Sequence, residues 1–247
     1  MNKLGLIAGN GVFPLEVARA ARRDGIEVIA VAHQGETNPA LAELVSAITW
    51  IKVGELQSMA DTFKAADVRE AAMAGGIARA SLPAAFAPDT RALAMLQRIG
   101  RFSDDAVLRG VAAEMEADGI AIIDPVPMLE GVLAGPGILS GPEPSAGQLK
   151  DLALAFAVAR AVGRFDIGQA VAVRDGVVAA VEAVEGTDHA LRRAAQLSGT
   201  GLVVAKAAKP GQDLRFDRPA IGPGTIELLA EISAAMIGIE AGTTMLL

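Results

Sequence analysis

The chain has 247 residues, of which 52% are hydrophobic, 21% charged and 3% aromatic, and its formal net charge is -7. It contains no cysteine, which excludes disulfides and thiolate metal sites, and its acidic balance argues against a nucleic-acid surface, because phosphate backbones are bound by clustered cations. Apolar stretches are short and broken, so none reaches the roughly 20 residues needed to cross a bilayer. We therefore expect a soluble α/β protein of the cytoplasm.

Strands, glycine turns and helices alternate through the first half of the chain. An apolar run from Lys3 to Ala8 predicts a strand, Gly9-Asn10-Gly11 a turn, and the spacing of apolar residues from Pro14 to Asp24 a helix. Further strands are expected near 27–32, 47–53, 70–73 and 120–123, with helices near 56–66 and from Ser103 as N-cap to Ala117. This alternation is typical of a parallel sheet.

The turn that follows the first predicted strand leaves backbone N–H groups at the start of a helix, where they can hold a phosphate or a ribose. A dinucleotide-binding turn would have a third glycine where Pro14 stands, and no acidic residue closes the second strand, which continues into Ala32-His33-Gln34. These features disfavour NAD and FAD. A tight strand-to-helix turn without a ligand stays an alternative.

Residues 134–147 are so rich in glycine and proline that they continue neither a helix nor a central strand. They predict a linker between an N-terminal Rossmann-like domain, 1–133, and a C-terminal α/β domain, 148–247. The C-terminal domain is expected to contain helices near 148–162, 187–195 and 225–235, and strands near 168–173, 177–184 and 202–206. The chain ends in an apolar run that predicts a strand. A truncated C-terminal domain stays an alternative.

The densest polar cluster of the chain is the segment AKAAKPGQDLRFDRPAIGPGT. Lys206, Lys209 and Arg215 can attract phosphate. Asp213 and Asp217 can hold a hard cation or a water molecule, and the prolines and glycines stiffen the backbone that presents them. This composition indicates a site for a phosphorylated substrate that is handled with a metal.

Two other runs are candidate parts of a site. GRFDIGQA joins a helix to a strand, and its alternative is an Asp-Arg pair that organises a bend. VEAVEGTD ends a strand in carboxylates, so Glu185 and Asp188 are candidates for a metal or a ribose hydroxyl. The alternative there is helix capping by Thr187 or Asp188. Arg192 lies one turn along the helix and can face the same ligand.

Several kinds of catalysis are disfavoured by what the sequence lacks. His33 and His189 are its only histidines and there is no cysteine, which argues against a zinc hydrolase. No G-x-S-x-G motif supplies a serine nucleophile. A hydrolase built on this chain would therefore use water as its nucleophile.

Taken in order, KLGLIAGNGVFP, GRFDIGQAV, VEAVEGTD and AKAAKPGQDLRFDRPAIGPGTI resemble the LpxI family, the UDP-2,3-diacylglucosamine pyrophosphatases of lipid A biosynthesis. The resemblance covers essentially the whole chain. It implies two α/β domains with the substrate held between them. It also implies magnesium-dependent hydrolysis of UDP-2,3-diacylglucosamine to UMP and 2,3-diacylglucosamine 1-phosphate (lipid X), with attack on the phosphorus nearer the sugar.

The motifs, together with the resemblance, assign roles to individual residues. Asp217 is the catalytic candidate, as a ligand of Mg²⁺ or as the group that orients the water, and Glu185 is the second metal candidate. The residues expected to bind substrate are Gly9, Asn10, Gly11, Val12, Gln169, Ala170, Gly186, Thr187, Asp188, Arg192, Lys206 and Lys209.

Two other functions are alternatives to the hydrolase. One is a nucleotide-sugar-binding module without catalysis, which would release no UMP in the presence of magnesium. The other is a nicotinamide-dependent oxidoreductase built on the first turn, against which Pro14 argues. A homodimer and peripheral contact with the inner membrane are further expectations, and no nucleic-acid partner is expected.

Overall fold

The chain is divided into two compact units by its contacts in a computed structural model, which describes residues 2–78, 86–100 and 103–247. Unit 1 consists of Met1–Glu130 and Asp213–Asp217, and unit 2 consists of Gly131–Gln212 and Arg218–Leu247. Both units combine helices with a sheet, which confirms the predicted α/β class. The five residues Asp213–Asp217 lie far along the predicted C-terminal domain and nevertheless pack with unit 1.

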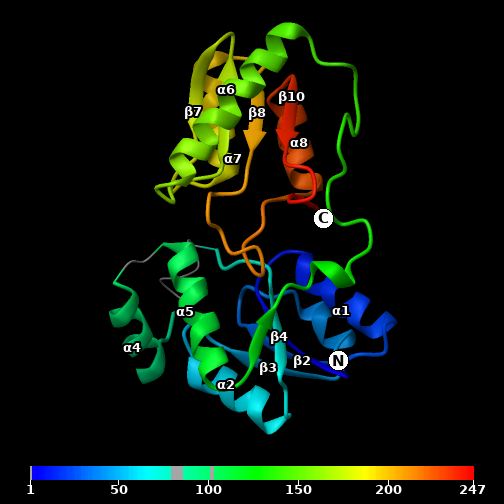
Figure 1. Cartoon of the computed structure of the whole chain (residues 1–247), viewed down its shortest axis with the longest axis vertical. Helices are drawn as coiled ribbons and strands as arrows, with labels where there is room; N and C mark the ends of the chain where they lie inside the picture. Colours follow the sequence, from blue (N-terminus) through cyan, green and yellow to red (C-terminus); the bar gives the residue numbers. More distant parts are fainter. Residues whose placement is uncertain (1, 79–85, 101–102) are drawn as a thin grey trace. The chain divides into compact units, whose positions relative to one another are not determined.

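Unit 1 is built on a parallel sheet in the strand order β3-β2-β1-β4-β5 (Figure 1). Its elements in chain order are β1 (Lys3–Ala8), α1 (Phe13–Arg23), β2 (Glu27–His33), η1 (Pro39–Glu43), β3 (Ala47–Ile51), α2 (Leu56–Ala65), β4 (Glu70–Ala74), α4 (Thr90–Ile99), α5 (Asp104–Ala117), β5 (Ala121–Ile123) and η2 (Val126–Met128). The order reverses between β1 and β4. In open parallel sheets, ligands bind outside the carboxyl ends of the strands near such a reversal.

Helices cover both faces of the sheet of unit 1. Successive side chains of a strand point to opposite faces, so Leu4 and Leu6 of β1 pack with α1 residues such as Val17, whereas Ile7 packs in the cluster that contains Phe63 of α2. The second cluster also takes residues from α4 and α5. The strands β1, β2 and β4 therefore read as continuous apolar runs, because both of their faces are buried.

Unit 2 has a mixed sheet in the order β10-β8-β6-β7, with β6 antiparallel to β7 and β8 (Figure 1). Its elements are α6 (Ala146–Gly163), β6 (Ala170–Arg174), β7 (Val177–Val181), α7 (Thr187–Ser198), β8 (Val203–Lys206), β9 (Ala220–Ile221), α8 (Pro223–Glu231), β10 (Met236–Ile239) and β11 (Met245–Leu246). The helix α6 packs on one face of the sheet. The helices α7 and α8 pack on the other.

The starts of two helices differ from the sequence prediction. Gly186 is the N-cap of α7, and the hydroxyl of Thr187, predicted as a cap, donates instead to Oε1 of Glu182 at 2.8 Å. Ser103 is the N-cap of α5 as predicted, but its side chain makes no cap hydrogen bond. The hydroxyl of Thr187 binds the buried carboxylate of Glu182 and therefore does not cap the helix.

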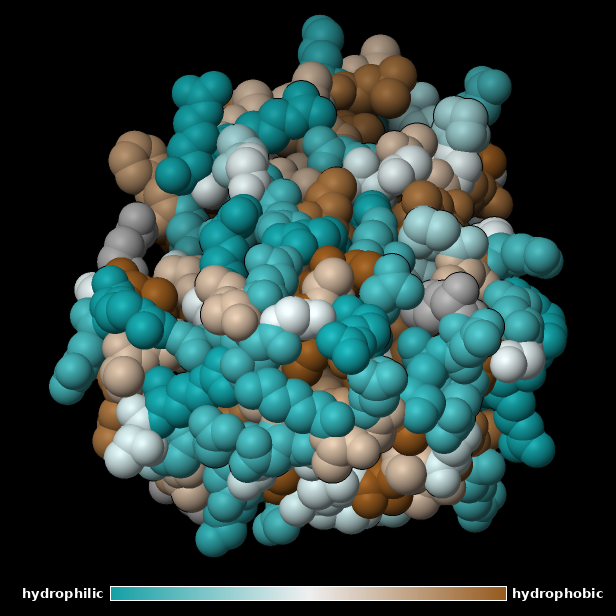
Figure 2. Space-filling view, turned by 60° about the horizontal axis from the view of Figure 1, so that its bottom comes forward, coloured by the Kyte–Doolittle hydropathy of each residue, from teal (hydrophilic) through white to brown (hydrophobic). Residues whose placement is uncertain are grey.

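Polar side chains dominate the face drawn in Figure 2, and apolar residues appear there in small separate groups. No helix within the described ranges combines the length and the apolar character that crossing a bilayer requires.

Glycine allows the ends of β1 and β4 to touch backbone to backbone. Gly9 N–H donates to Ala74 O at 2.8 Å, and Asn10 N–H donates to Gly76 O at 2.7 Å. A Cβ on Gly9 would lie 2.3 Å from the carbonyl oxygen of Gly76, and one on Gly75 would lie 2.2 Å from that of Asn10. Only glycine fits at these two positions, so the strand ends depend on them.

We predict that Gly9→Ala destabilises the protein by about 1–3 kcal/mol or more, because the methyl group would overlap backbone that cannot rotate away. Thermal and chemical unfolding measure the effect. Gly76→Ala is the matched control, because its Cβ would lie 3.6 Å from Oδ1 of Asn10, an ordinary contact. Equal stability of the two variants would contradict this account of the strand ends.

Candidate functional site

The turn after β1 presents backbone donors at the carboxyl end of the sheet. Gly9 and Asn10 use their N–H groups on the β4 side. Gly11, with φ of +82°, and Val12 donate no backbone hydrogen bond to another residue of the described part of the chain. Val12 is the N-cap of α1 without a side-chain cap. Two of the four predicted turn residues therefore hold the fold, and the other two have amides that a ligand can use.

Asn10 and Glu36 tie together the loops that follow β1, β2 and β4. Asn10 Nδ2 donates to Oε2 of Glu36 at 2.9 Å, and Gly76 N–H donates to Oδ1 of Asn10 at 3.3 Å. The same carboxylate oxygen of Glu36 accepts from the N–H of Ala78 at 2.9 Å. The amide of Asn10, predicted as a substrate contact, is thus engaged at both ends within unit 1.

A buried polar group anchors the loop after β2. His33 Nδ1 lies 2.9 Å from the carbonyl oxygen of Ala8, and the hydroxyl of Thr37 donates to the same oxygen at 2.6 Å. Thr37 Oγ1 also accepts from His33 N–H at 2.9 Å. Burial lowers the pKa of His33 from its ordinary value of 6.5, against raising effects of the Ala8 hydrogen bond and the charge of Glu36. The neutral ring therefore holds the loop at neutral pH.

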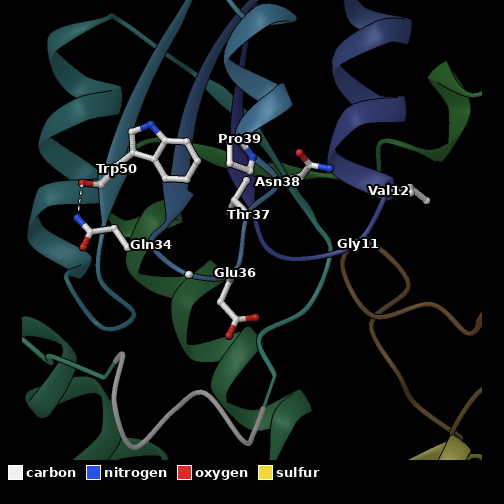
Figure 3. A pocket seen from close by; sticks show the side chains of 9 residues that line it. Gly11, Val12, Gln34, Glu36, Thr37, Asn38, Pro39 and Trp50 are labelled. Carbon is white, nitrogen blue, oxygen red and sulfur yellow. Dashed lines mark hydrogen bonds between the residues drawn. The ribbon is translucent and has the colours of Figure 1, made fainter.

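A pocket of about 820 Å³ opens at these strand ends (Figure 3). It is lined by Gly11, Val12, Gln34, Gly35, Glu36, Thr37, Asn38, Pro39 and Trp50. Figure 3 shows the indole of Trp50 and the side chain of Gln34 at one end and Val12 at the other. Gln34 Nε2 donates to the carbonyl oxygen of Trp50 at 3.5 Å. Two of the predicted substrate-binding residues, Gly11 and Val12, therefore line a pocket.

The segment Asp213–Asp217 is held in unit 1 by Arg215. Its guanidinium donates to both carboxylate oxygens of Asp213, to Oε1 of Glu116 at 2.8 Å and to the carbonyl oxygen of Ile122 at 3.1 Å. The adjacent Phe216 packs against the core that contains α2 and α5. One arginine and one aromatic ring thus fix this segment in unit 1.

The two aspartates of this segment have different surroundings. Hydrogen bonds from Arg215 lower the pKa of Asp213, and Arg109 lies 3.7 Å from the same carboxylate. Asp217 closes the turn with its N–H donating to Asp213 O at 3.0 Å. Asp213 is therefore a structural partner of arginine, and Asp217 stays the catalytic candidate.

In unit 2, a buried carboxylate gathers two of the sequence motifs. Oε2 of Glu182 accepts from the N–H groups of Gln169 at 3.1 Å and Ala170 at 2.9 Å. Its Oε1 accepts from the hydroxyl of Thr187. Gln169 and Ala170 of GRFDIGQA and Thr187 of VEAVEGTD thus lie together at one end of the sheet of unit 2. The carboxylate of Glu182 binds all three.

Both predicted lysines lie at the same end of that sheet. Lys206 is the last residue of β8, paired in register with Ala170 of β6, and its Nζ donates to Ala220 O at 2.9 Å. Lys209 Nζ forms an ion pair of 2.5 Å with Asp166 of GRFDIGQA, and both side chains are largely buried. This contact joins the lysine motif to the second motif.

Two charged residues of the predicted set are engaged elsewhere in unit 2. Arg192 on α7 lies 3.5 Å from Glu231 of α8, and no interaction in the described structure links it to the Glu182 group. Glu185 accepts a hydrogen bond from Arg193 and another from the N–H of Ala183. The hydrogen bond from its own backbone N–H is the largest cause that lowers the pKa of Glu185, and the bonds from Arg193 and Ala183 lower it further.

Glu36, Trp50 and Glu182 are not among the residues predicted from the sequence as parts of a site. Glu36 follows β2 by three residues and so lies beyond Ala32-His33-Gln34, where the sequence showed no acidic residue. Trp50 is the only tryptophan of the chain and stands on a strand, which was a usable signal. Glu182 was within a motif, but its carboxylate bonds to backbone N–H groups leave no pattern in the sequence.

The burial of His33 predicts a pH dependence of stability. Because the folded state disfavours protonation, the unfolded chain binds more protons below about pH 6.5, and the free energy of unfolding falls as the pH drops through that region. His33→Asn retains a donor for Ala8 O and should flatten the slope, by up to about 1.4 kcal/mol per pH unit for one proton.

Thermal unfolding between about pH 5.5 and 8 measures this slope. The exposed His189, the only other histidine, provides the control, because His189→Asn makes the same substitution at the surface. An equal slope in the His33→Asn protein would show that burial of His33 does not set it.

Comparisons with known proteins give a relative over the full chain. The UDP-2,3-diacylglucosamine pyrophosphatase LpxI of Caulobacter vibrioides is 35% identical over 253 residues, which cover 98% of this chain and 89% of that protein. The similarity therefore extends over both proteins and is not limited to one shared domain.

Solved structures with partial similarity include biotin carboxylases. The biotin carboxylase domain of the Hydrogenobacter thermophilus 2-oxoglutarate carboxylase has a TM-score of 0.30 and 18% identity, covering 71% of this chain and 35% of that chain. The biotin carboxylase subunit of a pyruvate carboxylase has a TM-score of 0.30 and 16% identity, covering 80% and 42%. This chain thus matches less than half of each of these two chains.

Family models account for both halves of the chain. The LpxI N-terminal domain matches residues 3–132 and the LpxI C-terminal domain matches residues 135–247. The two matches follow one another in the order that the sequence motifs predict and leave only a few residues outside them. The chain therefore belongs to the LpxI family.

Proposed function

We propose that this protein hydrolyses the pyrophosphate bond of UDP-2,3-diacylglucosamine to UMP and 2,3-diacylglucosamine 1-phosphate in lipid A biosynthesis. The observation that carries the proposal is the 35% identity to a pyrophosphatase of this name over 98% of the chain. The gathering of motif residues at strand ends in each unit supports it. We place the activity in the cytoplasm, with the acylated substrate drawing the enzyme to the inner-membrane surface.

Asp217 is the proposed catalytic residue. A carboxylate can orient a water molecule and accept its proton as the water attacks phosphorus and the P–O–P bond breaks. Arg215 acts as its positioning residue, because it anchors the turn in which Asp217 lies. We do not propose Asp213 for this role, because its carboxylate accepts hydrogen bonds from Arg215.

Lys206 and Lys209 are the proposed phosphate-binding cations of unit 2. Each ammonium group would stabilise negative charge on phosphoryl oxygens, and the loss of one such donor typically costs about 3–4 kcal/mol of transition-state stabilisation. Their side chains are held near the sheet by Ala220 O and Asp166. This pre-positioning reduces the entropy lost on binding.

We propose Mg²⁺ as the metal. Asp217 is the first candidate ligand, as the alternative to its role in orienting the water, and Glu185 is a separate, second candidate. Carboxylate oxygens are ligands that magnesium prefers, and it is commonly bound by one or two of them with phosphate oxygens and waters completing the shell. Among the described residues, no group of three or more His, Asp or Glu side chains could hold a metal ion by itself. Glu185 is the weaker candidate because Arg193 already pairs with it. When bound, the ion withdraws charge from the pyrophosphate oxygens.

Asp217→Asn tests the proposal directly. With UDP-2,3-diacylglucosamine and Mg²⁺, the natural protein should release UMP and the sugar phosphate, and the variant should turn over about 10²- to 10⁴-fold more slowly with unchanged stability. Chromatography with mass spectrometry identifies the products. Asp175→Asn is the control, because Asp175 is 90% exposed on a hairpin at positive φ, which Asn tolerates. No UMP from the natural protein would refute the function, and normal turnover of Asp217→Asn would refute the residue.

Arg215→Ala should lower kcat by about 10²-fold without removing any proposed catalytic group, because a displacement of Asp217 by about 1 Å is enough for such a loss. Arg215→Lys should recover only part of the rate, since lysine lacks the planar fork. Arg69→Ala is the control, because Arg69 forms an ion pair with Asp67 in which both side chains are more than three-quarters exposed. Steady-state kinetics on folded variants measure the effect, and an unchanged kcat would show that the turn holds without Arg215.

A further inference from the structure

Unit 2 exposes three large apolar side chains on two of its loops. Phe165 is 73% exposed, Ile167 47% and Val184 76%. Phe165 and Ile167 lie between α6 and β6, and Val184 lies between β7 and α7. Single apolar side chains are common on protein surfaces, whereas a group of them at one place marks a site of interaction. The question is therefore whether the two loops lie together.

The backbones of the two loops touch at one end of the sheet. A Cβ on Gly168 would lie 2.2 Å from the carbonyl oxygen of Glu182, and the N–H of Glu182 donates to Ala170 O at 2.9 Å. Ile167 directly precedes Gly168, and Val184 follows Glu182 by two residues. The exposed side chains of both loops thus belong to the same end of unit 2. We call Phe165, Ile167 and Val184 the apolar patch.

The turn that carries two members of the patch has a fixed backbone, because α6 ends in a Schellman motif. The N–H of Ile167 donates at 3.4 Å to the carbonyl five residues earlier, and the N–H of Asp166 donates at 3.0 Å to the carbonyl three residues earlier. Asp166 takes the left-handed position of the motif with φ of +57°, and Lys209 holds its carboxylate. The turn therefore presents Phe165 and Ile167 to the solvent in one defined arrangement.

The charges around the apolar patch favour an anionic partner. Arg164, the neighbour of Phe165, is exposed and forms no ion pair with a described residue. The carboxylates of Asp166 and Glu185 are each paired with a cation. Asp188 is exposed in the first turn of α7, where the positive end of the helix offsets its charge. A guanidinium beside apolar side chains suits a surface that is negatively charged and also takes up hydrocarbon groups.

The size and place of the apolar patch fit a lipid surface. A stable protein interface buries roughly 800 Å² on each partner, whereas three side chains at loop tips offer much less. Lys206 and Lys209, the proposed phosphate-binding cations, lie at the same end of the sheet, because β8 runs toward this end and α6 finishes at it (Figure 1). An end of unit 2 that receives the head group of an acylated substrate therefore carries the apolar patch as well.

We propose that the apolar patch and Arg164 dock unit 2 on the surface of an anionic lipid bilayer, with the ring of Phe165 among the upper parts of the acyl chains. The inference rests on the proposed function, which gives the enzyme a substrate with two acyl chains. It assigns a membrane-facing side to unit 2. It also gives a role to residues outside the predicted catalytic and substrate-binding set.

Vesicle sedimentation tests the docking without any substrate. The natural protein should bind vesicles of phosphatidylglycerol and phosphatidylethanolamine, and Phe165→Ser should weaken this binding about 10-fold, because transfer of one large apolar side chain into hydrocarbon contributes a factor of this size. Leu197→Ser is the matched control, since Leu197 is 70% exposed at the far end of α7. Absence of binding by the natural protein, or an equal loss in both variants, would overturn the inference.

The role of Arg164 is tested by the charge of the vesicles. Arg164→Gln should weaken binding to the anionic vesicles, leave the weaker binding to phosphatidylcholine vesicles unchanged, and lose its effect at high salt. Lys150→Gln is the control, because it removes one exposed cation at the opposite end of α6. Equal binding of the two variants would show that the position of Arg164 does not matter.

A tryptophan placed in the apolar patch reports insertion. The chain has one tryptophan, so Phe165→Trp in a Trp50→Phe background has a single emitter. Its emission should shift to shorter wavelengths with anionic vesicles and should be quenched by lipids brominated on their acyl chains. Val177→Trp in the same background is the control, because Val177 is 66% exposed at the opposite end of β7. Equal quenching at both positions, or quenching at neither, would contradict insertion of the patch.

Kinetics with two forms of the substrate separate docking from catalysis. With UDP-2,3-diacylglucosamine carried in vesicles, Phe165→Ser should raise the apparent KM about 10-fold with little change in kcat. With a dissolved short-chain analogue, it should change neither constant. An equal rise with the dissolved analogue would show that Phe165 contacts the single substrate molecule, and would overturn docking on a bilayer.

The outcomes also distinguish this inference from the proposed function. Vesicle binding through Phe165 by a protein that releases no UMP would support the docking surface and refute the function. Hydrolysis by a protein that binds no vesicles would overturn the docking surface and leave the function intact.

Discussion

The site in unit 1 depends on the contact between the backbones of β1 and β4. Gly9 and Gly75 let two strand ends approach until any side chain would overlap a carbonyl oxygen. This approach sets the place of Asn10, whose amide then reaches both Gly76 and Glu36. Without this contact, Asn10 would not hold the loops after β1, β2 and β4 together, and the residues of these loops that line the pocket would not keep their positions.

Both units use a carboxylate to organise backbone rather than to react. Glu36 accepts from an amide side chain and a backbone N–H, and Glu182 accepts from two backbone N–H groups and a hydroxyl. Such charge-assisted bonds are stronger than those between neutral groups. In each unit, motif residues that are distant in sequence therefore keep fixed positions at the end of a sheet before any ligand arrives.

Much of the fold could be predicted because local signals coincide with element boundaries. Apolar runs bounded by glycine predicted β1 and β2, and the strands expected near 168–173 and 177–184 correspond to the antiparallel pair β6 and β7. The chemistry of the site was less visible. The ion pair of Lys209 with Asp166 joins two motifs that are distant in sequence, so only the tertiary structure shows it. Asp213 has several charged residues near it in sequence, and the sequence does not tell that Arg215 is its partner. Periodicity carries no information about such partners.

The location of the segment Asp213–Asp217 has a consequence for the order in which the protein is completed. A ribosome delivers the five-stranded sheet of unit 1 long before it delivers Arg215 and Phe216, and domains tend to fold as they emerge. Until Arg215 is made, Glu116 and the carbonyl oxygen of Ile122 cannot accept its hydrogen bonds. Unit 1 therefore begins folding first and finishes only after most of unit 2 has been made, so an interrupted synthesis yields a sheet without the turn that carries Asp217.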